Sequence, residues 1–302
     1  MHLPNVNANA VFPQRLLPLL FALPQLLALV LFFYWPAIQA LWWSFNRVQP
    51  FGGHETFVGL DNFRRVLGDP CVLNSLYSTL VFSLSSVLLS MVIALLLAVS
   101  LEFKLRGKTL WRNLLIWPYA VSGAVIGIVF NVLANPVIGL LAWLNEIAPG
   151  VWAPYANPTQ GMALLIVAYS WCMAPLNFVI FSASLQSVPD DYLAAAALDG
   201  ANIWQRLRDI QLPMIAPFLL LVFVIDLLES LSNSFGLVET LTHGGPGDAT
   251  NIMAYKIYSD GFIGLDLAGS SALSVLMLLG VILLSLIQFR LLARRKRIAN
   301  LP

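Results

Sequence analysis

Six apolar stretches of about 20 residues or more alternate with shorter polar segments along this 302-residue chain. A helix of that length, rising 1.5 Å per residue, crosses the hydrocarbon core of a bilayer. The pattern therefore predicts an all-α integral membrane protein with six transmembrane helices. The predicted spans are Leu16–Trp35, Leu76–Leu101, Leu110–Ala134, Gly161–Leu185, Met214–Phe235 and Ser270–Leu292.

Composition supports this class, because 59% of the residues are hydrophobic and only 10% are charged, which is far more apolar than a soluble domain. The net charge of +1 and the lack of a basic cluster interleaved with aromatic residues argue against nucleic acid as a partner. The first apolar stretch is longer than a signal-peptide core and no small-x-small cleavage site follows it, so we expect an uncleaved anchor. Breaks in the spans are expected at Pro118, Pro136 and Pro175.

Twelve of the 16 Lys and Arg residues fall on one side of the six predicted spans, and four fall on the other. Because positively charged loops remain in the cytoplasm, this count places both termini and the segment 189–213 on the cytoplasmic side. The expected organisation is a cytoplasmic N-terminus (1–15), a six-helix membrane domain (16–292) and a basic cytoplasmic tail (293–302).

Pro189–Pro213 is the only sizeable hydrophilic insert that carries the sequence signals of helices. Its first proline suits a first helical turn, and Asp190 and Asp191 place negative charge near the positive end of the helix dipole. Gly200 can adopt the left-handed conformation that ends a helix, and Asn202 can cap the next helix. The segment is therefore predicted to form a helix, a turn and a second helix.

In the second of these helices Ile203, Leu207 and Ile210 fall on one apolar face, and we expect the helix to stop before Pro213. The run of alanines Ala194–Ala197 in the first helix leaves its backbone free to enter a narrow cleft on another protein. Two interpretations follow from the spacing alone. The insert is either a docking element or an amphipathic connector that lies on the membrane surface.

Polar residues inside the predicted spans are informative, because a charged side chain such as Asp costs about 2.5–3.5 kcal/mol at the centre of a spanning helix. Asp226, Glu229, Ser230 and Asn233 form one stripe of the fifth span, and Asn177 belongs to a polar stripe on the fourth. We expect Asp226 and Glu229 to face inward, either along a translocation pathway or as a structural pair with a partner subunit. A serine-rich stripe on the second span is expected to pack helices closely: Thr79, Ser83, Ser86 and Ser90.

The outer loops 46–74 and 236–269 are longer than simple connectors. They are expected either to receive a partner that delivers a solute or only to cap the helix ends. After the turn Gly244–Gly247, a short amphipathic element is expected on the outer surface. The segment 135–160 has four prolines, several aromatic residues and no basic residue, and it is predicted to lie at the membrane interface.

Motifs for enzyme chemistry are missing from the sequence. There is no phosphate-binding G-x-x-x-x-G-K-[ST], no H-E-x-x-H, no paired cysteine ligand set and no G-x-S-x-G. The sequence therefore predicts that this chain is not an enzyme and binds neither metal nor nucleotide by a known motif.

The insert resembles the E-A-A loop of ABC importer permeases, whose pattern is E-A-A, then D-G-A, then I-x-L-P. The matching residues are Ala195, Ala196, Asp199, Gly200, Ala201, Ile210, Leu212 and Pro213. The resemblance implies that this loop sits in a groove of an ATP-binding subunit and transmits its movement. Ala194 stands where the family usually has a glutamate that pairs with a basic residue of that subunit. Either Asp190 or Asp191 is an alternative partner for that basic residue.

Nearly the whole chain resembles the carbohydrate importer permeases, and especially their sn-glycerol 3-phosphate branch. F-V-G-L-D-N-F at Phe57–Phe63 is shared widely, and Y-K-I-Y-S-D-G-F-I-G-L-D-L-A-G-S-S-A at Tyr255–Ala272 is closer to that branch. The resemblance implies a bacterial inner-membrane complex of two different permease subunits, two ATP-binding subunits and a periplasmic substrate-binding protein. ATP and Mg would then bind to the partner subunits, and this chain would form half of the translocation pathway.

The expected substrate is sn-glycerol 3-phosphate or a glycerophosphodiester. No Lys or Arg lies in the middle of any predicted span, however, and Asp226 and Glu229 would repel a phosphate. A neutral sugar or polyol therefore remains an alternative. An ion-coupled secondary transporter that uses Asp226 and Glu229 as a proton-accepting pair is a third possibility.

Overall fold

The computed structural model describes residues 16–49, 52, 55–102 and 113–299. Three segments lie outside the described residues: the expected N-terminal segment 1–15, the segment 103–112 and the tail residues 300–302. The segment 103–112 contains four of the basic residues that were counted for orientation. The described chain is mostly helical, which confirms the all-α membrane class. Five of the described helices are long and apolar enough to span a membrane: Leu20–Ser44, Pro70–Ser100, Pro158–Gln186, Ile203–Ser232 and Leu267–Gln288.

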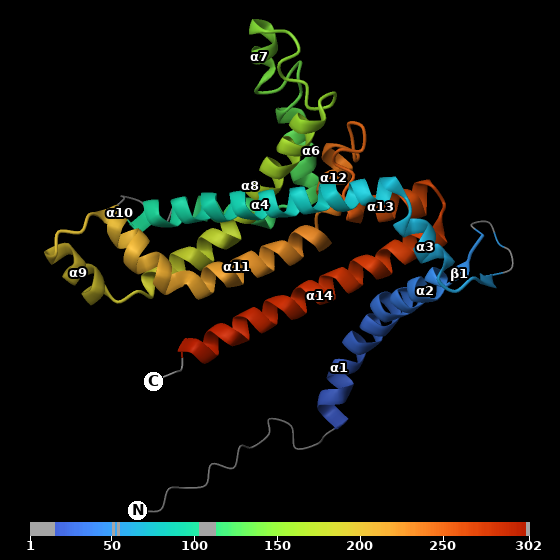
Figure 1. The fold of residues 1–302 in the computed structure, drawn as a ribbon, viewed down its shortest axis with the longest axis horizontal. Helices are drawn as coiled ribbons and strands as arrows, with labels where there is room; N and C mark the ends of the chain where they lie inside the picture. The colour runs from blue at the N-terminus through green and yellow to red at the C-terminus, as the bar shows by residue number, and fades with distance from the viewer. Residues whose placement is uncertain (1–15, 50–51, 53–54, 103–112, 300–302) are drawn as a thin grey trace, which may run out of the picture.

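Three of the long helices run side by side along the length of the molecule (Figure 1). They are α4 (Pro70–Glu102), α11 (Leu212–Ser232) and α14 (Leu267–Ala299). The helix α8 (Pro158–Gln186) packs extensively on α4 and also on α11. The first span is different, because α1 (Leu16–Leu29) diverges from the bundle and only its continuation α2 (Trp35–Ser44) packs against α14.

The packing of α4 on α8 follows from small polar residues on the facing sides of both helices. Ser83, Ser86 and Ser90 are at most 1% exposed. Ser170 on α8 is also fully buried, and its hydroxyl donates a hydrogen bond to the carbonyl oxygen of Ser86 at 3.1 Å. Small side chains let two backbones approach closely. The structural interpretation of the serine stripe is confirmed.

Two predicted helix ends were wrong for the same physical reason. The first span continues past Trp35 to Ser44, and the helix that begins at Ile203 continues through Pro213 into α11. In each case a π-helical turn stands immediately before the X-Pro step: η1 (Val30–Tyr34) and η3 (Leu207–Gln211). A proline lacks an N–H and its ring presses on the carbonyl four residues earlier. The wider π-turn relieves both problems, so the helix continues.

The predicted third span is not one straight helix. Residues Asn113–Ala120 and Gly123–Leu133 meet at an angle of 105°. The first part ends in the 3₁₀ turn η2 (Trp117–Ala120), which contains Pro118. The second part is α6 (Gly123–Leu133), capped by the Ser122 hydroxyl. The expected break at Pro118 is confirmed, and the bent pair is the sixth candidate span.

The other two prolines differ from each other, and only the expected break at Pro175 was not found. The helix α8 continues through Pro175, and Pro136 lies in the turn beyond the end of α6. A proline inside a spanning helix is tolerated where neighbouring helices support the backbone. Pro175 is buried among such neighbours.

The F-V-G-L-D-N-F motif forms part of a small module at the end of α2. The strands β1 (Asn46–Arg47) and β2 (Thr56–Phe57) pair antiparallel, and α3 (Asp61–Leu67) follows them. The buried Asn62 amide donates to the carbonyl oxygens of Ser44 at 3.0 Å and Asn46 at 2.9 Å. This one side chain ties the motif to the end of the first span.

The amphipathic element that was expected on the outer surface is partly buried instead. The helix α13 (Met253–Tyr258) packs against α4 and α14, and its Met253, Tyr255 and Lys256 are buried. The Lys256 ammonium pairs with the Asp260 carboxylate at 2.9 Å on the next turn, η4 (Ser259–Ile263). The alternating pattern could not distinguish a membrane surface from contact with neighbouring helices.

Candidate coupling surface and transport cavity

The helix α9 (Asp190–Leu198) carries no buried residue. Its last residue, Leu198, is 90% exposed, and Tyr192 is 57% exposed. Figure 1 shows α9 at one end of the molecule, beyond the ends of α4 and α11. An exposed helix with large apolar side chains at the tip of a protein is typical of a docking element.

The turn after α9 has the geometry that the sequence predicted. Gly200 has φ +83°, and the Ala201 amide donates to the carbonyl oxygen of Ala196 at 2.9 Å, which closes the helix end. Asn202 and Gln205 then form a reciprocal capping box at the start of α10 (Ile203–Arg206). Both helix ends are therefore held by local hydrogen bonds, and the angle between α9 and α10 depends on Gly200.

The expected apolar face of the second helix is only partly buried. Leu207 is 6% exposed and belongs to the core cluster between α4 and α8, and Ile210 is half-buried. Ile203 and its neighbour Trp204 are 53% and 64% exposed. Sequence reasoning missed Trp204, although an exposed tryptophan beside a helix start is a signal for an interface.

The acidic side chains of the insert are exposed, and no ion pair to Asp190, Asp191 or Asp199 is found among the described residues. Asp190 and Asp191 lie four and three residues before Ala194, which is also exposed. Positions three and four apart share one face of a helix. These two carboxylates are therefore placed one turn from Ala194 on the same exposed face.

Three of the pathway candidates are buried inside the subunit. Asn177, Asp226 and Ser230 are at most 1% exposed. The Ser90 hydroxyl and the Asn177 amide donate to the same oxygen of Asp226, Oδ2, at 2.7 Å and 2.5 Å. The Asn177 amide also donates to the Ser90 Oγ at 3.1 Å. This cluster joins α4, α8 and α11, and the sequence did not connect Ser90 with the two other residues.

The other two candidates lie at the end of α11, beside a cavity of about 280 Å³. The Asn233 amide donates to the Glu229 carboxylate at 2.5 Å. Asn233 lines the cavity, together with residues that the sequence analysis did not single out: Tyr119, Val121, Gly123, Tyr169, Cys172, Met173 and Leu237. The cavity lies where the third span bends, so the break at Pro118 helps to form it.

The cavity wall offers hydrogen-bonding groups without charge. Tyr169 is 3% exposed, and within the described residues its hydroxyl has no hydrogen-bond partner. Tyr119 and Asn233, which also line the cavity, carry a hydroxyl and an amide. Aromatic rings and amides that converge on a cavity suit a hydroxylated solute.

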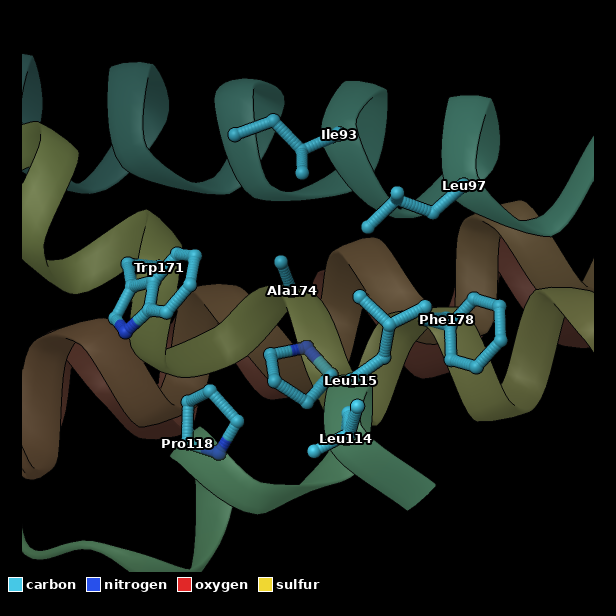
Figure 2. A pocket seen from close by; sticks show the side chains of 9 residues that line it. Ile93, Leu97, Leu114, Leu115, Pro118, Trp171, Ala174 and Phe178 are labelled. Atoms are coloured by element: carbon cyan, nitrogen blue, oxygen red, sulfur yellow. The ribbon is translucent and has the colours of Figure 1, made fainter. Parts of the chain in front are cut away.

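A second, smaller pocket of about 60 Å³ differs in character (Figure 2). It lies between α4, α8 and the part of the third span before the bend, with Pro118 and Pro175 in its wall. Figure 2 shows aliphatic side chains of α4 facing Ala174 and the Trp171 ring. The lining is almost wholly apolar, so it does not suit a hydrophilic solute.

An outer loop between α12 (Phe235–Leu241) and α13 has a well-defined shape. The Thr250 hydroxyl lies 2.7 Å from both the Thr242 hydroxyl and the Gly245 carbonyl oxygen. Burial and the charge of Glu239 raise the pKa of Tyr255, which lies under the loop at Gly244. Contacts inside the loop and with Tyr255 therefore hold its shape. Residues such as His243 and Asp248 remain exposed.

A model of the family described as "Binding-protein-dependent transport system inner membrane component" matches residues 74–298. The chain belongs to this family. The match begins at the start of α4 and includes the insert, the cavity and the outer loop. The assignment to ABC importer permeases is confirmed, and these are transport subunits whose ATPase activity lies in separate subunits.

Similar permeases cover almost the full chain. The sn-glycerol-3-phosphate transport system permease protein UgpA of Brucella abortus is 41% identical over 287 residues, with 95% of this chain and 98% of the relative covered. The protein of the same name from Rhizobium meliloti is also 41% identical over 287 residues, with the same coverage. The protein of that name from Pectobacterium atrosepticum is 39% identical over 289 residues, with 96% and 98% covered.

Solved structures show the same permease fold at low identity. A bacterial ABC transporter involved in the import of the acidic polysaccharide alginate gives a TM-score of 0.76 at 20% identity, covering 92% of this chain and 96% of that chain. An inward-facing structure of the MetNI methionine ABC transporter gives a TM-score of 0.53 at 18% identity, covering 78% and 98%. The arrangement of helices in this permease is therefore shared with importers of different solutes.

Replacing Tyr169 by phenylalanine tests whether the cavity of this permease contacts the solute. The change removes a buried hydroxyl without a partner, so the melting temperature is expected to stay the same or to rise slightly. Uptake is expected to need a higher solute concentration, because the cavity loses a polar group. Concentration-dependent uptake and thermal unfolding of the purified complex measure both effects. Tyr77→Phe, at a 67% exposed position, is the control, and unchanged uptake by Tyr169→Phe would exclude this hydroxyl from the pathway.

Proposed function

We propose that this chain is one of two different permease subunits of an importer for sn-glycerol 3-phosphate or a related glycerophosphodiester. The observation that carries the proposal is the identity of 41% to glycerol-phosphate permeases, which extends over 95% of the chain. A periplasmic binding protein delivers the solute, and two ATP-binding subunits supply the energy. ATP and Mg bind to those subunits, and this chain contributes no cofactor site.

The exposed helix α9 and the start of α10 are the proposed contact with an ATP-binding subunit. Support comes from the absence of buried residues on α9 and from its place at the tip of the molecule. In this proposal both termini and α9 lie in the cytoplasm. Ala194 provides no carboxylate, so Asp190 or Asp191, one turn earlier on the same face, meets the basic partner group.

Recognition of the phosphate is assigned to the other components. Among the described spanning helices, Lys and Arg occur only at Arg206 and Arg208, at the α10 end of one helix. Lys256 is 6% exposed and is already paired with Asp260. The cavity of this subunit therefore contacts the glycerol hydroxyls, and the second permease or the binding protein provides the cations or helix N-termini that bind phosphate.

The test is ATP hydrolysis by the reconstituted complex of both permeases, the ATP-binding subunits and the binding protein. Binding protein loaded with glycerol 3-phosphate is expected to stimulate hydrolysis strongly, and a maltose-loaded binding protein is expected to have no effect. A neutral sugar or polyol is the second candidate solute, because the cavity lining is uncharged. If only a neutral solute stimulates hydrolysis, that solute and not glycerol 3-phosphate is the substrate. Uptake that survives ATP depletion but collapses with the proton gradient would contradict an ATP-driven importer.

A further inference from the structure

A groove on the surface of the subunit lies apart from the transport cavity. It is formed by the starts of α4 and α8 together with Ala249 of the outer loop, and its volume is about 450 Å³. The groove shares no lining residue with the transport cavity. In Figure 1 the start of α8 lies beside α6 and away from the axis of α4, although the two helices pack extensively farther along. The groove therefore occupies the place where α4 and α8 separate.

The lining of the groove changes from polar to apolar along the two helices. The polar part, nearest the helix starts, is lined by Asn74, Tyr77, Ser78 and Thr159. The apolar part, farther along, is lined by Val81, Met162, Ala163 and Ile166. Residues 158–166 of α8 cover about 12 Å, at a rise of 1.5 Å per residue. Because both helices are long and apolar enough to span a membrane, the groove runs from the ends of two spans into them.

The groove differs from the other apolar surfaces of the spanning helices. Side chains such as Leu26 on α1 and Leu279 on α14 are 50% and 55% exposed, and ordinary bilayer lipid meets such side chains at no fixed position. In the groove, Val81, Met162 and Ile166 are half-buried and line a concave space. A concave apolar site with a few polar groups fixes the orientation of its ligand. We therefore expect a molecule with an apolar tail and a polar head.

A carboxylate near the polar part determines which head group fits. The lining itself contains no charged side chain. The Asn74 amide donates to the backbone carbonyl oxygen of Asp248 at 3.3 Å, which places the exposed Asp248 beside the groove. Within the described residues the Asp248 carboxylate has no cationic partner. It attracts an ammonium group and repels an anionic head group.

No free cation of the outer surface is found near the groove among the residues that the structure describes. Three basic side chains there are already in ion pairs: Arg64 with Asp61, Arg65 with Asp266 and Lys256 with Asp260. The polar part instead offers uncharged donors, the hydroxyl groups of Ser78 and Thr159. Hydroxyl groups can bind a phosphate but do not neutralise its charge. The head group must therefore carry its own positive charge.

We propose that the groove binds one phospholipid whose head group carries an ammonium group, as in phosphatidylethanolamine. One acyl chain lies against Val81, Met162 and Ile166. The phosphate accepts hydrogen bonds from the hydroxyl groups of the polar part, and the ammonium group pairs with Asp248. The lipid fills the space between α4 and α8 and supports the ends of both helices. This site concerns a membrane lipid and not the transported solute, so it is independent of the proposed function.

Photo-labelling of the full complex in lipid nanodiscs tests the site. The probe is phosphatidylethanolamine with a photoreactive diazirine on one acyl chain, and labelled peptides are identified by their mass. Label is expected to concentrate on residues 74–81 and 158–166, well above the level on the exposed helix α1. Equal labelling of α1, α14 and the groove would indicate ordinary lipid contact and would overturn the proposal. A groove without label, because another subunit covers it, would also overturn it.

Filling the groove gives a second measurement. Ala163 is an exposed residue of the groove wall, so Ala163→Trp places a large ring in the space of the acyl chain. Labelling of the groove is expected to fall to the level found on α1, while the other components still co-purify with this chain. Leu88→Trp, at a 56% exposed position of α4 outside the lining, is the matched control and should keep the label. Unchanged labelling of Ala163→Trp would contradict the site.

Competition between unlabelled lipids tests the head group without filling the groove. Phosphatidylethanolamine is expected to displace the probe about fivefold better than phosphatidylglycerol with the same chains, which is the size of an exposed ion pair. Asp248→Asn should remove this preference and leave the labelling in place. Asp61→Asn, at another exposed carboxylate of the outer surface, is the control and should keep the preference. Equal competition by the two lipids in the wild type would overturn the proposal.

Discussion

Replacing Gly200 by valine is expected to reduce transport at least tenfold while the complex remains assembled. Gly200 has φ +83°, a region in which a β-branched residue is strongly disfavoured. The left-handed conformation costs an ordinary residue roughly 1–2 kcal/mol, which corresponds to about tenfold in the population of the turn. The helix α9 would then lose its fixed angle to α10, and a rigid transmission of movement from the ATP-binding subunit would fail.

Assembly is expected to survive because α9 carries no buried residue and only the partly buried Leu193 packs against the core of the membrane domain. A Cβ atom at Gly200 meets no other atom within 4 Å, so the effect comes from the backbone and not from a steric clash with a neighbour. The measurements are uptake of labelled glycerol 3-phosphate into proteoliposomes and co-purification of the four components. Gly280→Val is the matched control, since Gly280 also has open space around it but lies in α14 without a positive φ. Normal uptake by Gly200→Val would refute the coupling assignment.

The features of this turn could be predicted because their signals are local. Gly200 and Asn202 determine a helix end and a helix start through hydrogen bonds to residues within five positions. The lengths of the spans could also be predicted, because they depend on the thickness of the bilayer. Local signals gave the wrong helix ends at Pro36 and Pro213. A proline predicts that a backbone hydrogen bond is lost, but it does not predict whether a π-turn before it lets the helix continue.

The angle of the third span and the composition of its cavity depend on distant contacts. Pro118 predicted a break, but the 105° bend follows from packing of α6 on α12, where the Thr240 hydroxyl donates to the Ala124 carbonyl oxygen at 2.9 Å. Tyr169 is followed by the polar Ser170, but Ser170 bonds to α4, so this neighbour did not mark Tyr169 as part of a cavity. Ser90 was assigned to helix packing for the same reason, because its partner Asp226 lies 136 residues away.

The location of Asp226 changes the interpretation of the polar stripe. The sequence placed Asp226 and Glu229 together as pathway candidates, with a structural pair as the alternative. In the structure Glu229 is half-buried and bonds to Asn233 beside the cavity, whereas Asp226 is fully buried between three helices. We therefore propose different roles for the two carboxyl groups. Glu229 orients a cavity residue, and Asp226 holds α4, α8 and α11 in register.

Replacing Asp226 by leucine is expected to destabilise the subunit strongly. The change puts a larger, apolar side chain between the three helices and leaves the buried Asn177 amide without its carboxylate acceptor, whereas the Ser90 hydroxyl keeps the Val87 carbonyl oxygen as an acceptor. Each unsatisfied buried group costs about 1–3 kcal/mol. The melting temperature of the purified complex and the amount of assembled complex in the membrane should both fall clearly.

Asp226→Asn separates a structural role from a role in transport. The asparagine retains a carbonyl oxygen that accepts from Ser90 and Asn177, so assembly and the melting temperature should stay close to those of the wild type, and uptake should persist. If the carboxyl group instead contacts the solute or carries a proton, this variant would assemble normally and lose uptake, which would contradict the structural role. Glu229→Ala is the control at a half-buried carboxyl group of the same helix. There uptake should change more than stability, because the Asn233 side chain beside the cavity loses its carboxylate partner while the three-helix junction remains intact.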